Sequence, residues 1–248
     1  MKMTRAAAFL GTICIVISFS ACGPSLQKQS RLDFDNQVKA IQTIGLLGPD
    51  MMIYELSAGG VRELMDEWVE AATKNFSTVL KKELQGRGLQ VKTIVLKEAS
   101  DDEEISYLFR AITESLKWNK TYRKLSLCED ERICKDFSLG AMDQIFSKHK
   151  IDALLMVFGK NEMETAAREK ARKRSKAFGA FTRVALGVGI SPLDGPGTHV
   201  SMALVDRNGS VLWYTGASSS RVYDLRDEAK VSEVTKRMLG HMWVAEQK

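Results

Sequence analysis

The sequence has few of the residues that enzymes use at their active sites. It holds three histidines, His149, His199 and His241, and none of them stands at a metal-binding or catalytic spacing. It has no Gly-x-Ser-x-Gly, no phosphate-cradling glycine loop and no His-Glu-x-x-His, and the glycines of residues 187–189 follow a basic run rather than a strand. The sequence therefore predicts a protein that is not an enzyme and has no metal, cofactor or small-molecule substrate.

A long hydrophobic run is also lacking. The longest apolar stretch, residues 6–19, is shorter than the roughly 20 residues that a membrane-spanning helix needs. Lys2 and Arg5 precede it, as in a secretory signal. Residues 17–25 read ISFSACGPS, so small residues lead directly into Cys22. This arrangement resembles the lipobox of bacterial lipoproteins, which implies cleavage before Cys22 and a lipid on its sulfur.

A lipidated Cys22 is one of three interpretations of this segment. The others are a plainly cleaved signal and an uncleaved short anchor. We expect a signal peptide over residues 1–21, whose removal lowers the formal charge from +5 to +3 because Lys2 and Arg5 are lost. So small an excess of positive charge predicts no nucleic-acid partner. The hydrophobic content of 44% suffices for one good-sized core, and we expect a single domain over residues 39–248.

Thiols are scarce, with four cysteines in the chain. Cys14 lies inside the apolar run and should be lost with it. Beyond Cys22 only Cys128 and Cys134 remain, and five residues separate them. Disulfides persist in exported proteins, so we expect these two to form one. Unpaired thiols, or a metal held with the intervening acidic residues, are the alternatives.

The rest of the chain predicts an α/β fold. Residues 22–38 are polar and predict a flexible tether. The expected strands are residues 40–47, 51–56, 89–96, 153–158, 199–205 and 211–217, and the expected helices follow residues 57–60, 100 and 224 or lie within 139–149. This order predicts one three-layer-like domain, in which helices pack on a mixed β-sheet and a C-terminal β-hairpin precedes a last helix.

Local signals support these elements. Apolar residues recur at three- and four-residue spacing from Val61 and Leu64 to Leu84, which predicts one buried face of a long helix. Ser100 and Glu103 form a capping box, and Asp224 is expected to cap the last helix. The Asn208-Gly209 pair between two strands predicts a hairpin with a type I′ turn.

An insertion over residues 160–197 separates the apolar strand from the hairpin. Its first part is strongly basic and its second part is apolar and aromatic, a pattern that suits an anionic membrane surface. A solvated helix followed by a loop packed on its own domain is the alternative. The candidate membrane- or partner-binding residues are Arg168, Lys170, Arg172, Lys173, Arg174, Lys176, Phe178, Phe181 and Arg183.

The hairpin residues 205–213, VDRNGSVLW, resemble those of envelope lipoproteins related to the curli secretion lipoprotein CsgG, the accessory lipoprotein PelC and the penicillin-binding-protein activator LpoB. The resemblance covers about residues 41–242 and implies a domain like the N-terminal domain of TolB, used for oligomerisation or protein binding. In the CsgG-like relatives the insertion builds part of a pore, which implies a secretion-channel subunit as an alternative function.

The resemblance also implies a location. Gly23, rather than Asp, follows Cys22, which resembles the default of export to the outer membrane in enteric bacteria. We therefore expect a lipoprotein on the periplasmic face of the outer membrane, with the inner membrane as the alternative. Its partners would be the membrane, other envelope proteins or further copies of itself.

Overall fold

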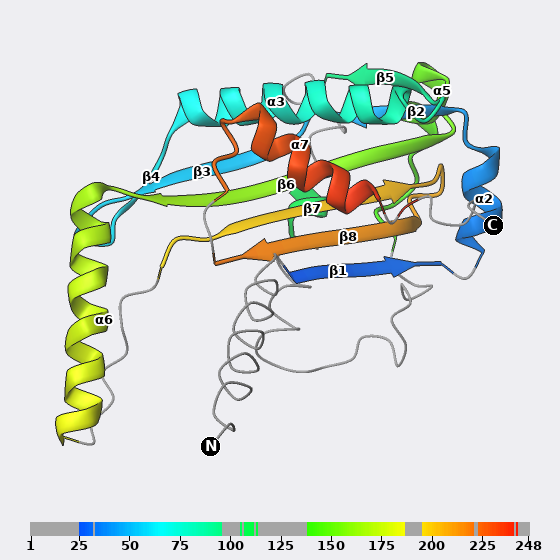
Figure 1. The fold of residues 1–248 in the computed structure, drawn as a ribbon. Coiled ribbons are helices and arrows are strands. Elements are labelled where there is room, and N and C mark those ends of the chain that lie inside the picture. Colours follow the sequence, from blue (N-terminus) through cyan, green and yellow to red (C-terminus); the bar gives the residue numbers. More distant parts are fainter. Residues whose placement is uncertain are drawn as a thin grey trace, which may run out of the picture.

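The computed structural model describes residues 25–31, 33–95, 105, 107–111, 113, 138–186, 195–220, 223–240 and 242. Figure 1 shows how their strands and helices are arranged. In chain order these are β1 (Ser25–Ser30), α2 (Phe34–Ala40), β2 (Thr43–Leu47), β3 (Asp50–Leu56), β4 (Arg62–Leu64), α3 (Asp66–Gln85), β5 (Gln90–Ile94), α5 (Asp143–His149), β6 (Ala153–Glu164), α6 (Ala166–Leu186), β7 (Thr198–Val205), β8 (Val211–Ser219) and α7 (Glu228–Leu239).

The described strands form one mixed sheet. Its order is β1-β8-β7-β6-β2-β5, and β3 pairs with the second half of β6 and with β4. β2 runs parallel to β5 and β6, whereas β6, β7, β8 and β1 pair antiparallel in succession. The predicted mixed sheet is confirmed, and β6 lies at its centre because its long apolar run can be covered on both faces.

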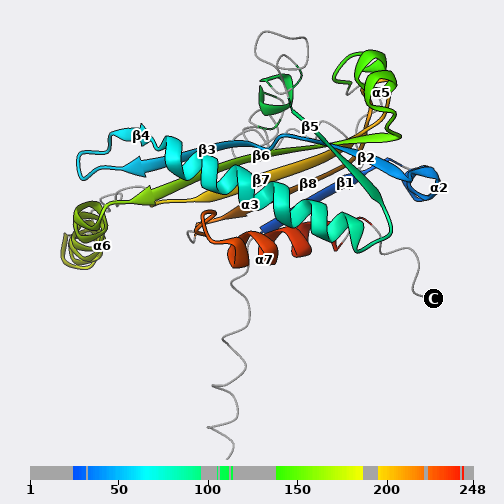
Figure 2. The same ribbon diagram turned by 90° about the horizontal axis from the view of Figure 1, so that it is seen from above.

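Helices cover both faces of the sheet, which makes three layers (Figure 2). α3 and α7 pack on one face, where Phe76, Leu80 and Trp213 are among the buried core residues. α5 lies on the other face, over a second core that contains Phe146 and Phe158. The predicted α/β fold class, with the C-terminal hairpin and helix, is therefore confirmed.

The structure corrects the flexible tether predicted over residues 22–38. Ser25–Ser30 form β1, which pairs antiparallel with β8 from Ser25 opposite Ser218 to Ser30 opposite Trp213. α2 follows directly and buries Phe34 and Val38. The polar sequence of these residues does not predict a strand. β1 is an edge strand, which is stabilised by its backbone pairing with β8 rather than by an apolar face of its own.

Two helix starts also differ from the prediction. Val61 and Leu64 belong to β4 and its approach, where their side chains are 67% and 46% exposed, so the long helix begins only at Asp66. The last helix is capped by Asp227, whose carboxylate accepts a hydrogen bond from the Ala229 amide. Asp224 instead accepts from the Arg226 amide in the preceding turn.

The predicted type I′ turn is wrong. Gly209 has a φ of 75°, but Asn208 does not have a positive φ. The Gly209 amide bonds to the Asp206 carbonyl, and the Asp206 amide bonds to the Ser210 carbonyl. The hairpin is therefore a longer loop that closes on one left-handed glycine.

The insertion is also placed differently from the prediction. Its first residues, 160–164, continue β6 and pair with β3, and residues 160 and 161 also pair with β7. The helix α6 then occupies residues 166–186 and runs away from the sheet (Figure 1). The signal peptide, Cys22, the capping box at Ser100 and the pair Cys128 and Cys134 lie outside the described residues, so these remain predictions.

Candidate functional site

Thr165, which directly precedes α6, fixes the start of this helix to the end of the sheet. Its amide donates to the Leu56 carbonyl at 3.0 Å, which ties the turn to β3. Its hydroxyl accepts a hydrogen bond from the Arg168 amide at 3.3 Å, as an N-cap does. The chain therefore leaves β6 and enters α6 in a defined direction rather than through a loose loop.

A nearly buried carboxylate anchors the first two turns of α6. Glu164 is only 4% exposed, and both of its oxygens accept from Arg172 Nε, at 2.8 and 2.9 Å. Arg168 Nε lies 3.8 Å from the same carboxylate, and its guanidinium also donates to the Ser57 carbonyl at 3.4 Å. The hydrogen bond to Glu164 raises the pKa of Arg172 above its ordinary value. Two of the predicted binding residues thus hold α6 in place.

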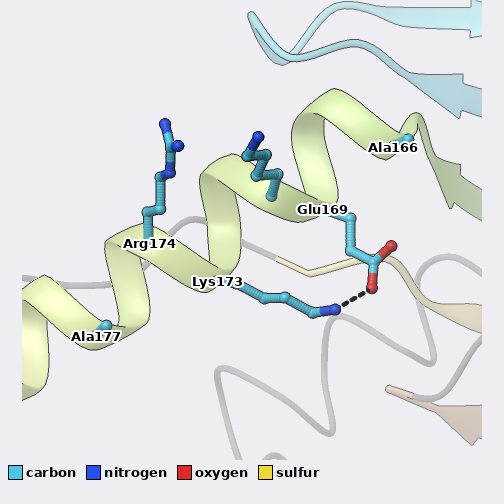
Figure 3. A pocket seen from close by; sticks show the side chains of 6 residues that line it. Ala166, Glu169, Lys173, Arg174 and Ala177 are labelled. Carbon is cyan, nitrogen blue, oxygen red and sulfur yellow. Dashed lines mark ion pairs between the residues drawn. The ribbon is translucent and has the colours of Figure 1, made fainter.

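A different face of α6 is open to solvent. Figure 3 shows Glu169 and Lys173 paired across one turn, with their charged groups 2.7 Å apart. Hydrogen bonding to Lys173 lowers the pKa of the exposed Glu169 carboxyl. Together with neighbouring residues they line a shallow hollow of about 410 Å³. Its lining residues are Ala166, Glu169, Lys170, Lys173, Arg174 and Ala177.

The remaining described cations of α6 are exposed. Among the described residues, Lys170, Arg174 and Lys176 have no carboxylate partner. Phe178 and Phe181 lie farther along the same helix, with 59% and 65% of their surfaces exposed. The structure thus gathers most of the predicted binding residues on one helix, but it divides them between cations that contact Glu164 and side chains that are exposed. The side chain of Arg183 lies outside the described residues.

Sequence reasoning missed a polar chain on the β7–β8 hairpin. The Ser201 hydroxyl lies 2.9 Å from His199 Nε2 and 3.0 Å from the Tyr214 hydroxyl, while Ser218 Oγ lies 2.8 Å from His199 Nδ1. Alternation along the strand places His199 and Ser201 on one face, and this spacing was the available signal. Ser201 has no exposed surface, so a substrate cannot reach its hydroxyl in this conformation. These contacts give the buried polar side chains of β7 and β8 their hydrogen-bond partners.

Replacing Tyr214 with Phe is expected to change the response to alkaline pH. Burial raises the pKa of Tyr214, so the folded protein resists forming the phenolate and loses stability as pH rises above the ordinary tyrosine value of about 10. Tyr214→Phe should cost about 1 kcal/mol at neutral pH through the lost hydrogen bond, and this deficit should shrink above pH 10. Urea unfolding at several pH values measures both quantities, and a deficit that stays constant would contradict the expectation.

The described residues hold no group of three or more His, Cys, Asp or Glu side chains placed to bind a metal ion. None of the helices within these ranges combines the length and the apolar character needed to cross a membrane.

Comparison with known proteins gave a distant likeness in fold. No protein-family model matches the chain, and no curated protein matches it in sequence. Its fold is similar to the PelC dodecamer from Paraburkholderia phytofirmans, with 11% identity, 87% of this chain and 95% of that chain covered, and a TM-score of 0.34. A single-substitution variant of that dodecamer gives 11% identity, coverage of 88% and 97%, and a TM-score of 0.35. Likeness at this distance carries no argument about function.

Proposed function

We propose that the protein is a lipid-anchored, non-enzymatic lipoprotein that binds proteins as an assembly component of the cell envelope. The observation that carries the proposal is the segment of residues 17–25, in which a short signal-like run ends in small residues and Cys22. Gly23 after the cysteine supports the periplasmic face of the outer membrane as the site of anchorage, with the inner membrane as the alternative.

The position of β1 supports a domain held close to its membrane. β1 begins at Ser25, so only Gly23 and Pro24 separate Cys22 from the sheet. Three residue steps span at most about 10 Å, far less than the tether predicted from the sequence. Partners should therefore be outer-membrane or membrane-proximal proteins, or further copies of the chain, rather than enzymes of the opposite membrane.

The shape of the candidate site supports binding of a surface rather than of a small molecule. Small-molecule sites are concave and bury most of their ligand. The exposed charges and aromatic side chains on α6 instead lie on a helix that extends away from the sheet (Figure 1). A projecting helix of this kind can contact another macromolecular surface.

An oligomeric secretion-channel subunit is the second candidate function. The observation that favours it is β4, a short edge strand whose three residues are all exposed and whose neighbour Val61 is also exposed. Exposed strand edges can pair with another chain. A ring of copies seen by electron microscopy would favour this candidate over a single anchored domain.

Substitution of Cys22 tests the lipid anchor. We expect Cys22→Ala to abolish incorporation of radiolabelled palmitate and to block cleavage, because the thiol that carries the lipid is gone. The protein should then accumulate as its precursor or be released from the membrane. Cys14→Ala is the matched control, since Cys14 lies within the segment that should be removed. Cys22→Ala protein that is still processed and membrane-bound would refute the lipoprotein proposal.

A further inference from the structure

The outer half of α6, here residues 174–182, buries small residues and exposes aromatic ones, which is the reverse of an ordinary surface helix. Such a helix turns its aromatic side chains toward the core and its small polar ones toward water. Here Gly179 and Thr182 are buried, whereas Phe178 and Phe181 are the exposed residues. The described part of the molecule leaves these two aromatic rings mainly in water, which indicates a surface that contacts something else.

The direction of α6 brings this half to one particular edge of the sheet. Ser25, Ser218, His199 and Lys160 lie opposite one another on β1, β8, β7 and β6, so three strand spacings, about 14 Å, separate the first from the last. Fifteen residues of helix from Ala166 cover about 22 Å. α6 runs from the β6 side toward and past β1, so its outer half projects beyond the β1 edge (Figure 1).

The same edge carries the proposed lipid. Cys22 lies at most about 10 Å from Ser25, at the start of β1. A membrane that holds this lipid must therefore lie close to the β1 edge. Because α6 projects past that edge, its outer half lies on the side from which such a membrane would approach.

The chemistry of this half fits an anionic lipid surface. Arg174 and Lys176 are exposed and, among the described residues, unpaired with any carboxylate. Lys170 lies only about 6 Å along the helix from Ala166 and does not reach the β1 edge. Each cation near an anionic bilayer strengthens binding by about 1 kcal/mol, which corresponds to about fivefold. Aromatic rings beside such cations favour the boundary between headgroups and acyl chains.

We infer that residues 174–182 of α6 form a membrane-contact tip, which seats on the anionic leaflet that holds the Cys22 lipid. Phe178 and Phe181 enter the headgroup boundary, and Arg174 and Lys176 pair with lipid phosphates. This inference rests on the proposed lipid anchor. The tip gives the anchored domain a second point of attachment, and two points fix its orientation where a single lipidated cysteine would leave it free to rotate.

Acetylation of lysines by a water-soluble reagent tests the tip on the mature lipoprotein. The protein is placed in detergent, in vesicles of phosphatidylcholine, and in vesicles that also contain phosphatidylglycerol, and mass spectrometry gives the rate at each lysine. On the anionic vesicles the rate at Lys176 should fall about tenfold. Lys74 and Lys81, which are exposed on α3, provide the internal control and should react equally in all three.

Two variants separate the tip from general surface effects. Phe178→Ser with Phe181→Ser should restore most of the acetylation on anionic vesicles, and its folding is checked by circular dichroism. Val61→Ser with Leu64→Ser removes two exposed apolar side chains elsewhere and should leave the protection intact. Concentrated salt should weaken the protection, because it screens the cations from the lipid.

The other outcomes overturn the inference in distinguishable ways. Equal acetylation on neutral and anionic vesicles, with the protein still floating with both, would refute the tip and leave the lipid anchor intact. Protection that appears in detergent and grows with protein concentration would assign this half of α6 to contacts between copies. Protein that fails to float with neutral vesicles would refute the lipid anchor and, with it, this inference.

Discussion

Glu164→Gln is expected to lower the free energy of unfolding by about 2–3 kcal/mol and to loosen α6 from the sheet. The substitution leaves Arg168 and Arg172, whose side chains are only 10% and 17% exposed, facing a neutral amide. Removing one partner of a buried ion pair costs more than the pair contributes, because the remaining charge is left without compensation. Amide hydrogen exchange along α6 should accelerate more than exchange in β7 and β8.

Glu169→Gln is the matched control for this change. It removes the same kind of charge from the same helix, but Glu169 and Lys173 are 48% and 70% exposed. An exposed pair of this kind contributes little to stability, because solvent screens its charges. Equal effects of the two substitutions in urea unfolding would show that Glu164 does not anchor the helix.

Gly209→Ala is expected to destabilise the protein by about 3–5 kcal/mol, a large fraction of the stability of an ordinary domain. Gly209 has a φ of 75°, which strains any residue with a Cβ. A Cβ at this position would also overlap the carbonyl group of Gly140. The Gly209 carbonyl accepts from the Leu139 amide at 2.8 Å, so the turn cannot move without displacing the segment that leads into α5.

Gly88→Ala separates strain from steric overlap. Gly88 has a φ of 83°, but nothing lies within 4 Å of the position that its Cβ would take. Gly88→Ala should therefore lower the free energy of unfolding only by the cost of the left-handed conformation, about 1–2 kcal/mol. Thermal unfolding of both variants measures the difference, and similar losses would mean that the contact with Gly140 is readily relieved.

The elements that the sequence predicted are those with a local signal. The apolar run at residues 153–158 and the hairpin around Asn208-Gly209 became β6, β7 and β8, and the helical spacing from Trp68 to Leu84 became α3. β1 and β4 carry no such signal. Residues 25–30 read SLQKQS, and they form a strand only because β8 offers a free edge from a distant part of the chain.

The candidate site was predicted by composition but not by geometry. The basic and aromatic residues of the insertion do lie on one helix, as their charge and apolar pattern suggested. Their division into anchoring and exposed cations depends on Glu164, which belongs to the end of β6 and contacts Arg172 two turns along α6. Side-chain direction at a strand–helix junction is set by tertiary packing, and residue spacing alone does not specify it.

The pairing of β1 with β8 sets the order in which the sheet can be completed. Ser25 pairs with Ser218, which lies 193 residues later in the chain (218 minus 25). Closing so long a loop is slow, and the partner strand does not exist until nearly the whole chain has been synthesised. Until β1 docks, β8 is a bare edge that carries Trp213 and Tyr214, and bare edges promote aggregation. The newly synthesised protein is therefore prone to aggregate until β1 pairs with β8.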